Sequence, residues 1–351
     1  MTAFRPQGKI PVGILGATGS VGQRFIELLV DHPWFDIVAL TASERSAGKP
    51  YGEAAHWLQA TPLPESIAAL EVLPTGPPLP AKLLFSALDS RAADTAEAAL
   101  AKAGHFVVSN AKSHRMDPDV PLMVPEINGD HLHLVEHQSW GDGAIVTNPN
   151  CSTIGLVLAL QPLHQAFGIE AAHVVTLQAL SGAGIPGVPS MAVIDNVIPH
   201  IGGEEDKIET EPLKILGRRE GGRIEPAAMT LSAQVNRVPV IDGHLECVSV
   251  RLGQKASLDA LRDALDSFRG EPQALELPSA PAQPVVVLDA DDRPQPRLDR
   301  DRGRGMAVSV GRLRPCPLFD YKFVVLSHNT IRGAAGGSIL VAEQAVAKGL
   351  V

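Results

Sequence analysis

The sequence of 351 residues predicts an α/β protein with two domains, because its hydrophobic pattern changes near the middle of the chain. In residues 1–150, short apolar runs alternate with helical patterns, which is typical of a doubly wound parallel sheet. In residues 151–330, longer segments of alternating polar and apolar residues predict an α+β domain with an open, mainly antiparallel sheet. Residues 331–351 return to a helical pattern, and we expect them to pack back on the first domain.

The first domain begins with a predicted strand at 10–16 and a helix at 19–30. The pattern then predicts strands at 36–41, 82–88, 105–109 and 143–147, and a helix at 91–103. The stretch 61–80 is rich in Pro and Gly, and we expect it to be a loop. In open sheets of this kind, ligands bind at the carboxyl ends of the strands.

Glycines recur at every third position from Gly13 to Gly22, between the first strand and its helix. Glycines there let the backbone approach a pyrophosphate, and the helix N-terminus offers N–H donors to the anion. A plain glycine turn is the alternative. The strand-turn-helix context favours a dinucleotide and hence a Rossmann-like domain. The residues of this turn expected to contact the dinucleotide are Gly16, Thr18, Gly19, Ser20 and Val21.

The residues after the second strand indicate which dinucleotide is bound. An NAD site would place Asp or Glu at the end of this strand to hold the ribose 2′-hydroxyl. The chain instead has Ser43, Arg45 and Ser46, with Lys49 beyond them. Hydroxyls and cations suit the 2′-phosphate of NADP, so the sequence predicts NADP. Glu44 is discordant, although an acid in a loop can point into solvent.

Ser86 and Asp89 occur at the carboxyl end of the predicted strand 82–88. They either face the ligand crevice of the sheet or are ordinary loop residues that include a helix cap.

Cys151 lies between the apolar strand 143–147 and a helical pattern at 154–167, just past a tight turn at 148–150. A thiol at the first turn of a helix is close to unpaired N–H groups and to the positive end of the helix dipole, and both favour the thiolate. The thiolate is the nucleophilic form. A small buried core residue is the alternative, and we favour the nucleophile.

The second domain has predicted strands at 172–180, 230–236, 245–252 and 321–326. The Asp- and Arg-rich stretch 271–304 is interpreted as a solvated loop or a subunit contact, because its charges nearly balance.

Three polar clusters in this domain are difficult to explain by folding alone. Gln178 ends a strand and precedes the glycine-rich loop 181–184, which could lie under a nicotinamide. Residues 204–207 open a helix that runs to about 216, and Arg237 and His244 lie at the mouth of a strand pair. The plainer alternatives are a polar strand end, a surface lysine at position 207 and a loop histidine.

The composition restricts the class of protein. A net charge of −9 argues against nucleic acid as a partner. No apolar stretch approaches the ~20 residues needed to span a bilayer, so we expect no membrane contact, and residues 1–9 lack a signal peptide's apolar segment. Three cysteines with irregular spacing predict no disulfide framework, so we expect a reducing, cytoplasmic setting.

Other thiols and histidines receive plainer interpretations. His131, His133 and His137 have a ligand-like spacing, but no acid or Cys completes a site. We therefore interpret them as surface histidines and expect no bound metal. Cys247 alternates with apolar neighbours in a predicted strand and is expected in the core, whereas Cys316 lies in a loop flanked by prolines.

Five of these features and a sixth segment occur together in the order of a known family. They are the glycine turn, residues 148–153, Gln178 with its Ser-Gly-Ala-Gly loop, residues 204–207, the Arg237/His244 pair and residues 328–336. The joint pattern covers about residues 10–348 and resembles the aspartate-β-semialdehyde dehydrogenase family, in the branch common in archaea and fungi.

The resemblance implies a reaction. L-Aspartate 4-semialdehyde, phosphate and NADP⁺ would interconvert with 4-phospho-L-aspartate and NADPH, as a step in lysine (diaminopimelate), threonine, methionine and isoleucine biosynthesis. Residues 1–150 with 331–351 would bind NADP, and residues 151–330 would form the catalytic and dimerisation domain.

The resemblance also implies a role for each site residue. Cys151 would attack the acyl carbon, His244 would be the acid/base, and Gln178 would orient the acyl group. The substrate and phosphate ligands would be Arg237, Glu204 (or Glu205), Lys207, Arg115 and Asn150. Arg237 would bind the α-carboxylate, Glu204 the α-amino group, and Lys207 and Arg115 the phosphate. Ser181, Gly182 and Asn329 would lie at the cofactor.

Alternatives of two kinds remain. An acyl-CoA (malonyl-CoA) reductase of the same fold would not need both an ammonium partner and a phosphate site. The substrate of N-acetyl-glutamyl-phosphate reductase has an acylated amine, which leaves no cation for Glu204 to bind. A non-catalytic NADP-binding paralogue would be free to lose the thiol or the base. We expect a homodimer or homotetramer, because the second sheet leaves one face to cover.

Overall fold

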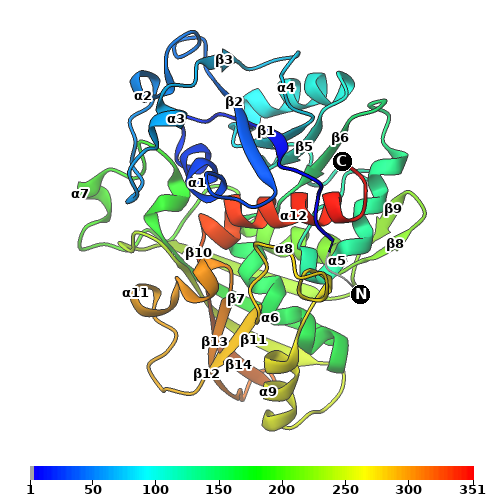
Figure 1. Ribbon diagram of the computed structural model, residues 1–351. Coiled ribbons are helices and arrows are strands. Elements are labelled where there is room, and N and C mark those ends of the chain that lie inside the picture. Colours follow the sequence, from blue (N-terminus) through cyan, green and yellow to red (C-terminus); the bar gives the residue numbers. More distant parts are fainter. Residues whose placement is uncertain (1–3) are drawn as a thin grey trace.

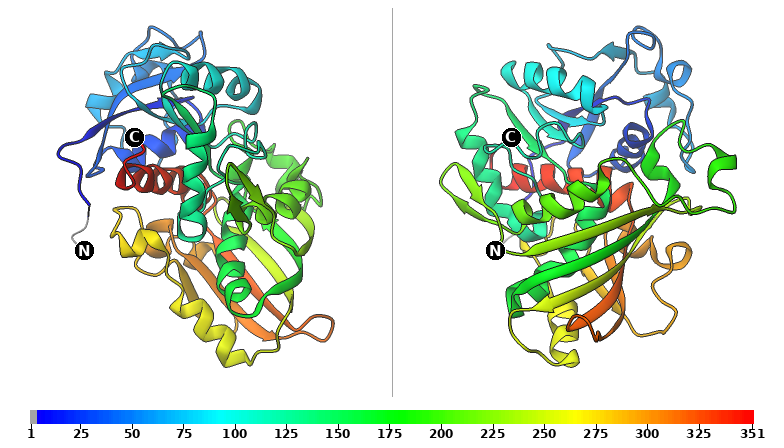
Figure 2. Two further views of the ribbon diagram at one scale, coloured as in Figure 1. Left: turned by 90° about the vertical axis from the view of Figure 1, so that its right-hand side faces the viewer. Right: turned by 180° about the vertical axis from the view of Figure 1, so that it is seen from behind.

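The computed structural model describes residues 4–351 and contains two six-stranded sheets, one from each half of the chain. In Figure 1 the first sheet lies at the top, in blue and cyan, and the second lies at the bottom, in green to orange. Helix α12 (Gly336–Ala347), in red, runs between them, and the two views of Figure 2 show the same arrangement. The end of the chain therefore lies at the junction of its two halves.

The first sheet has the strand order β3-β2-β1-β4-β5-β6, and all five pairings are parallel. Its strands are β1 (Ile10–Leu15), β2 (Phe35–Ala42), β3 (Val72–Pro74), β4 (Leu83–Ser86), β5 (Phe106–Ser109) and β6 (Ala144–Thr147). Its helices are α1 (Ser20–Leu29), α2 (Tyr51–Ala54), α3 (Glu65–Ala68), α4 (Ser90–Lys102) and α5 (Pro125–Asn128). The predicted doubly wound parallel sheet is confirmed.

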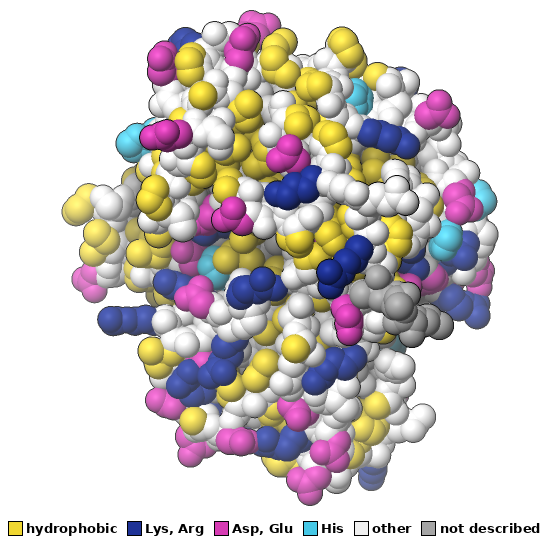
Figure 3. Space-filling model, in the orientation of Figure 1, with side chains coloured by type: hydrophobic (Ala, Val, Ile, Leu, Met, Phe, Trp, Pro, Cys, Tyr) yellow, Lys and Arg dark blue, Asp and Glu magenta, His cyan; other side chains and the backbone are white. Residues whose placement is uncertain are grey.

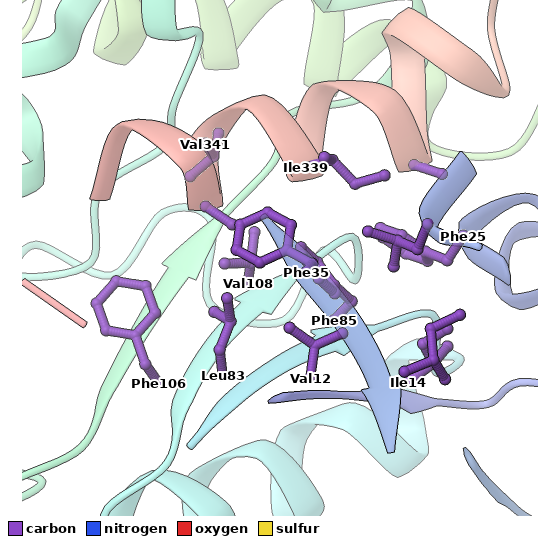
Figure 4. Packing of buried hydrophobic residues seen from close by; sticks show 14 of the residues in the cluster. Val12, Ile14, Phe25, Phe35, Leu83, Phe85, Phe106, Val108, Ile339 and Val341 are labelled. Atoms are coloured by element: carbon purple, nitrogen blue, oxygen red, sulfur yellow. The ribbon is translucent and has the colours of Figure 1, made fainter. Parts of the chain in front are cut away.

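The core of this half depends on helix α12. Its hydrophobic cluster joins Phe25 of α1 and Phe85 of β4, stacked at 5.0 Å, to Ile339 and Val341 of α12. Figure 4 shows these side chains filling the space between the sheet and α12. Helix α12 is apolar around most of its circumference, as expected of a helix buried on all sides.

The stretch 61–80 is not only a loop, as the Pro- and Gly-rich sequence suggested, because it contains α3 and β3. Val72 is fully buried and pairs with Leu40 of β2. Three residues are too few to show an alternating pattern, so the sequence could not reveal this edge strand.

The second sheet has the order β10-β7-β11-β14-β13-β12. The three central pairings are antiparallel, while β10 and β12 join the edges in parallel, so the sheet is mixed. Its strands are β7 (Ile169–Gln178), β10 (Thr230–Arg237), β11 (His244–Leu252), β12 (Val285–Leu288), β13 (Val308–Pro315) and β14 (Tyr321–Ser327). The two-stranded sheet of β8 (Arg218–Glu220) and β9 (Arg223–Glu225) lies apart.

Helices cover one face of the second sheet. The three that pack on it are α6 (Cys151–Phe167), α8 (Glu204–Ile215) and α9 (Leu258–Ser267). Short helices occur in the connections: α7 (Ser190–Val193), α10 (Glu271–Ala274) and α11 (Pro296–Asp299). Figure 2 shows the other face of the sheet without helices.

The stretch 271–304 also differs from the expected solvated loop. It contains β12, which pairs with β13, and two short helices. Asp299 is buried and accepts hydrogen bonds from Arg293 Nε (2.6 Å) and Arg302 Nε (3.0 Å). The charges of this segment therefore pair with one another and stabilise it. The sequence shows only that Asp and Arg are nearly balanced, which is equally true of solvated charges and of paired ones.

Two single-residue expectations were wrong. Cys247 is exposed, because β11 turns Glu246 and Val248 toward the helices and Cys247 toward the uncovered face. His131 is buried rather than at the surface; its Nδ1 accepts from Asn128 and its Nε2 donates to the Gly217 carbonyl.

The described residues also bear on membrane and metal binding. No helix among residues 4–351 is long and apolar enough to cross a membrane. Within the same residues, no cluster of three His, Cys, Asp or Glu side chains could hold a metal ion. Figure 3 shows acidic and basic side chains interspersed over one face of the molecule, without a patch of a single sign.

Candidate active site

Cys151 is the first residue of α6, and its sulfur lies 3.2 Å from Nε2 of His244, the first residue of β11. Asn150 caps the helix, since its side-chain oxygen accepts from the backbone N–H groups of Ser152 (3.0 Å) and Thr153 (3.3 Å). The cap fixes where the helix begins, and the sheet fixes where β11 begins. Residues 93 positions apart are thereby held as a thiol–imidazole pair.

The backbone selects the tautomer of His244. The N–H of Ala179 donates to Nδ1 at 3.0 Å, so the neutral ring carries its proton on Nε2 and directs it at the sulfur. Burial, and then the positive charge of Arg237, lower the pKa of His244 to about 3. The imidazole is therefore neutral near pH 7 and is a hydrogen-bond donor toward Cys151.

The Cys151 thiol is subject to opposing effects. Burial, and then the negative charge of Glu204, raise its pKa to about 12, whereas Arg115, Lys207 and Arg237 act to lower it. The start of a helix and the His244 N–H also favour negative charge on sulfur. The sequence predicted that the helix terminus would secure a thiolate, but the net effect of the surroundings is a raised pKa. The three cations reduce the effect of burial without cancelling it.

Glu204, at the start of α8, is the hub of a polar network beside the thiol. Its carboxylate accepts hydrogen bonds from Asn150 Nδ2 (2.8 Å), Gln178 Nε2 (3.2 Å) and Lys207 Nζ (2.5 Å). Burial acts to raise the pKa of Glu204, but Lys207 and these hydrogen bonds outweigh it and hold the pKa below its usual value. The carboxylate is thus ionised and held in place, while Glu205 instead accepts from the Val235 N–H.

Two further residues of α8 organise the site and were missed in the sequence. The buried Glu211 accepts from Arg115 Nη1 (2.8 Å) through one oxygen and from the backbone N–H of Asn150 (2.7 Å) through the other. Lys214 donates to three carbonyls of the loop that carries Arg115, at 2.7–2.8 Å. Both lie on the face of α8 that presents Glu204 and Lys207, because the spacing 204, 207, 211, 214 follows the helical repeat. That spacing was the signal available.

The rest of the site is formed by backbone turns. Arg237 Nη1 donates to the Ala179 carbonyl (2.5 Å), and Asn329 joins Ser181 Oγ (2.7 Å) to the Gly243 N–H (2.8 Å). A π-helical turn at Ile331–Ala335 brings Gly333 so close that a Cβ there would lie 2.9 Å from the Cys151 Cβ. Only glycine permits this approach.

These residues surround a cavity of about 410 Å³. The sequence-predicted residues in its lining are Ser20, Val21, Arg115, Asn150, Cys151, Gln178, Ser181, Gly182, Glu204, Lys207, Arg237 and Asn329. His244 is fully buried behind the thiol.

A second cavity, of about 850 Å³, shares Ser20, Val21 and Gly182 with the first, so the two adjoin. The predicted residues that line it are Gly16, Thr18, Gly19, Ser20, Val21, Ser43 and Gly182. The first helix starts here, and Gly22 packs so tightly that a Cβ would lie 2.3 Å from the Gly16 carbonyl oxygen. A cleft of this size at a helix N-terminus, with bare backbone along it, fits a dinucleotide.

Some predicted cofactor residues lie elsewhere. Ser86 is fully buried and is not in the lining of either cavity within residues 4–351, so a contact between Ser86 and the cofactor stays a prediction. Asp89 caps α4, accepting from the Arg91 and Ala92 N–H groups, and also lines both cavities. Glu44 lines the cleft, whereas Arg45 and Ser46 lie just outside its lining.

A family model described as semialdehyde dehydrogenase, NAD binding domain, matches residues 11–135, and one described as semialdehyde dehydrogenase, dimerisation domain, matches residues 160–332. Aspartate-semialdehyde dehydrogenase of Methanothermobacter thermautotrophicus is 52% identical over 342 residues, covering 95% of this chain and 98% of the relative. The chain belongs to the aspartate-semialdehyde dehydrogenase family.

Other members of the family agree in sequence and structure. The enzyme of Schizosaccharomyces pombe is 49% identical and covers 97% of this chain and 99% of the relative. The crystal structure of aspartate-semialdehyde dehydrogenase with NADP from Candida albicans is 48% identical, with a TM-score of 0.91, covering 97% of this chain and 100% of that one. The resemblance to archaeal and fungal aspartate-semialdehyde dehydrogenases is thus confirmed, as is the fold.

Proposed function

We propose that this chain is an NADP-dependent, phosphorylating aspartate-semialdehyde dehydrogenase. It converts L-aspartate 4-semialdehyde, phosphate and NADP⁺ to 4-phospho-L-aspartate, NADPH and a proton, and in biosynthesis it runs in the reductive direction. The observation that carries this proposal is the Cys151–His244 pair, 3.2 Å apart at the wall of a cavity that adjoins a dinucleotide-sized cleft. The family's NADP-bound member from Candida albicans supports the choice of cofactor.

The chemistry needs a nucleophile and a means of stabilising negative charge. In the oxidative direction Cys151 reacts as the thiolate, after its proton has passed to solvent, and its sulfur adds to the aldehyde carbon so that the negative charge passes to oxygen in a thiohemiacetal. NADP⁺, held along the cleft lined by Gly16, Gly19 and Gly182, would accept the hydride. The thioester that then remains on Cys151 would be attacked by phosphate. Cys151 leaves again as the thiolate when the acyl phosphate forms, and the proton released in the overall reaction is that of the attacking HPO₄²⁻. Because the Nε2 proton of His244 is directed at the reacting atoms, it can hydrogen-bond the charge on sulfur and then on oxygen. We therefore assign His244 chiefly as a donor.

The charged groups account for an amino-acid substrate. Arg237 would bind the α-carboxylate, because a guanidinium offers a planar pair of donors. Glu204 is ionised and lies in the lining of the cavity, so it would bind the α-ammonium, whereas Glu205 is not among the described residues that line it. Lys207 and Arg115 would hold phosphate, Gln178 would orient the acyl group, and Asn329 and Ser181 would contact the nicotinamide.

Glu204 separates this proposal from an acyl-CoA reductase. An acyl-CoA substrate such as malonyl-CoA brings no ammonium group, and an ionised carboxylate facing its acyl end would be repulsive. We further infer a homodimer through the uncovered face of the second sheet, consistent with the dimerisation-domain match, and a cytoplasmic setting in which Cys151 stays reduced.

The proposal is tested by NADP⁺ reduction at 340 nm with L-aspartate semialdehyde, with and without phosphate. The wild type should turn over only with phosphate, and Cys151→Ala should not turn over at all. Failure of well-folded, NADP-binding wild type to turn over would refute the assignment, and malonyl-CoA with NADPH would then be the substrate to try.

A further inference from the structure

A third cavity, of about 300 Å³, lies outside the active site and has no part in the proposed reaction. Four segments far apart in the sequence enclose it: the end of α1 with residues 31–33, residues 278–279, residues 304–306, and the start of α12 with Ile331. Figure 1 shows α1 beside the beginning of α12, and residues of both helices line this cavity. Its volume is at the lower end of the range for small-molecule sites, about 300–1,000 Å³.

Buried hydrogen bonds fix one wall of the cavity. Glu343 of α12 contacts His32 Nε2 at 2.8 Å and accepts from both the N–H (3.1 Å) and the hydroxyl (2.5 Å) of Ser279. Both His32 and Glu343 are at least nine-tenths buried. The loop at 278–279 is therefore anchored to the helix, so the cavity is a formed feature of the fold.

The lining combines both signs of charge with an apolar surface. Asp31 is exposed and makes no ion pair or side-chain hydrogen bond with any of residues 4–351, whereas Glu27 is occupied by Arg24 and Thr61. Arg304 donates to the Pro278 carbonyl (2.9 Å) through one nitrogen, which leaves its other N–H groups available. The apolar lining residues are Leu28, Pro33, Pro278, Met306, Ile331 and Ile339.

We propose that this cavity is a binding site for a free α-amino acid with an aliphatic side chain. Arg304 binds the carboxylate and Asp31 binds the ammonium group, each as a charge-assisted hydrogen bond. The side chain packs on Leu28, Met306 and Ile339. A ligand of this class pairs with Arg304 and Asp31 and also covers the apolar lining. A simple anion, a simple cation or a hydrocarbon would each leave part of the lining without a partner.

The site shares a structural element with the active site. Ile331 and Gly336 line the third cavity, while Asn329, Thr330, Gly333 and Ala334 line the cavity beside Cys151. The π-helical turn at 331–335 thus separates the two, and π-helical turns are frequent at functional sites. Occupation of the third cavity would bias the position of this turn and thereby change turnover.

Isothermal titration calorimetry with L-leucine and L-methionine, on the full chain saturated with NADP⁺, tests the proposal. We expect one site per chain. N-acetyl-L-leucine lacks the ammonium group and L-leucinamide lacks the carboxylate, so each should bind at least about tenfold more weakly. Arg304→Gln and Asp31→Asn should weaken L-leucine binding to a similar degree. Both side chains are exposed, so these variants should fold.

Matched controls are Arg297→Gln and Asp36→Asn, which remove exposed charges outside the cavity lining and should bind L-leucine like the wild type. The proposal is overturned if neither amino acid binds wild type at millimolar concentration, if both analogues bind as tightly as L-leucine, or if Arg304→Gln and Asp31→Asn retain wild-type affinity. Because binding is measured directly, the result is independent of the catalytic assignment.

Discussion

Replacing Glu211 by Gln should reduce activity although Glu211 touches no reacting atom. One carboxylate oxygen binds Arg115 Nη1 at 2.8 Å and the other binds the backbone N–H of Asn150 at 2.7 Å. A Gln side chain has the same shape, but its single oxygen can accept from only one of these donors. Its amide nitrogen must then face the other donor, so either the Arg115 guanidinium or the turn before Cys151 loses its partner.

The size of the effect follows from the bond that is lost. A hydrogen bond involving a charged group contributes about 1.5–3 kcal/mol. If that contribution is needed to position Arg115 or Cys151 in the transition state, kcat/KM should fall by about 10- to 150-fold, at tenfold per 1.4 kcal/mol. Alanine is less informative, since it leaves Arg115 buried without a counter-charge, at a cost of about 3–5 kcal/mol in stability.

Steady-state kinetics with varied phosphate is the assay. We expect Glu211→Gln to raise the KM for phosphate or to lower kcat, with the thermal unfolding midpoint little changed. Glu209→Gln is the matched control, because Glu209 lies on the same helix but, among residues 4–351, accepts only from the Ala233 N–H, which a Gln oxygen can also do. Kinetics of Glu211→Gln indistinguishable from those of Glu209→Gln would refute the positioning role.

Three further predictions concern His244, Arg45 and Cys247. The pKa of His244 is lowered to about 3, below its unfolded value of about 6.5. The neutral form of His244 therefore adds to the free energy of unfolding above pH ~6.5, and this contribution is lost as the pH falls toward the pKa of His244 in the folded protein. His244→Gln should flatten this acid dependence in urea unfolding, and an unchanged dependence would contradict the burial argument. Arg45→Gln should raise the KM for NADP by about two- to fivefold, because an exposed ion pair contributes that much to binding, and it should leave the KM for NAD unchanged. An equal effect on both cofactors would exclude a contact between Arg45 and the 2′-phosphate. Cys247, on the uncovered face of the second sheet, should be protected from alkylation in a homodimer, and labelling as fast as in the denatured chain would argue against that interface.

Sequence reasoning was most successful where one residue lies at a junction of strong patterns. Cys151 is preceded by a buried strand and followed by a long apolar helix, so its place at a helix start was predictable from local order alone. The glycine turn, with its strand and helix on either side, was predictable for the same reason.

The misses depend on tertiary contacts that local patterns do not contain. Strand β12 has four residues and is a strand only because β13 pairs with it. Cys247 was assigned to the wrong face because both faces of β11 carry apolar residues. Glu211 accepts from Arg115, which lies 96 residues earlier in the chain, so the local sequence could not reveal its partner.

The sequence also could not show that burial and the nearby cations shift the pKa of Cys151 in opposite directions. The sequence shows the start of a helix but not that the thiol is buried, nor that the cations of Arg115, Lys207 and Arg237 surround it. Likewise the Ala179 N–H that sets the tautomer of His244 comes from a different strand end. Charge and protonation in the site are set by residues brought together only in the fold.

The central claim is that Cys151 forms a thioester with the substrate, and a single turnover without phosphate tests it most directly. Enzyme mixed with L-aspartate semialdehyde and NADP⁺ should release a rapid burst of NADPH approaching one equivalent per active site. Mass spectrometry of the quenched protein should find the aspartyl group on the peptide that contains Cys151. A full burst from Cys151→Ala, or an aspartyl group on any other residue of the wild type, would contradict the account.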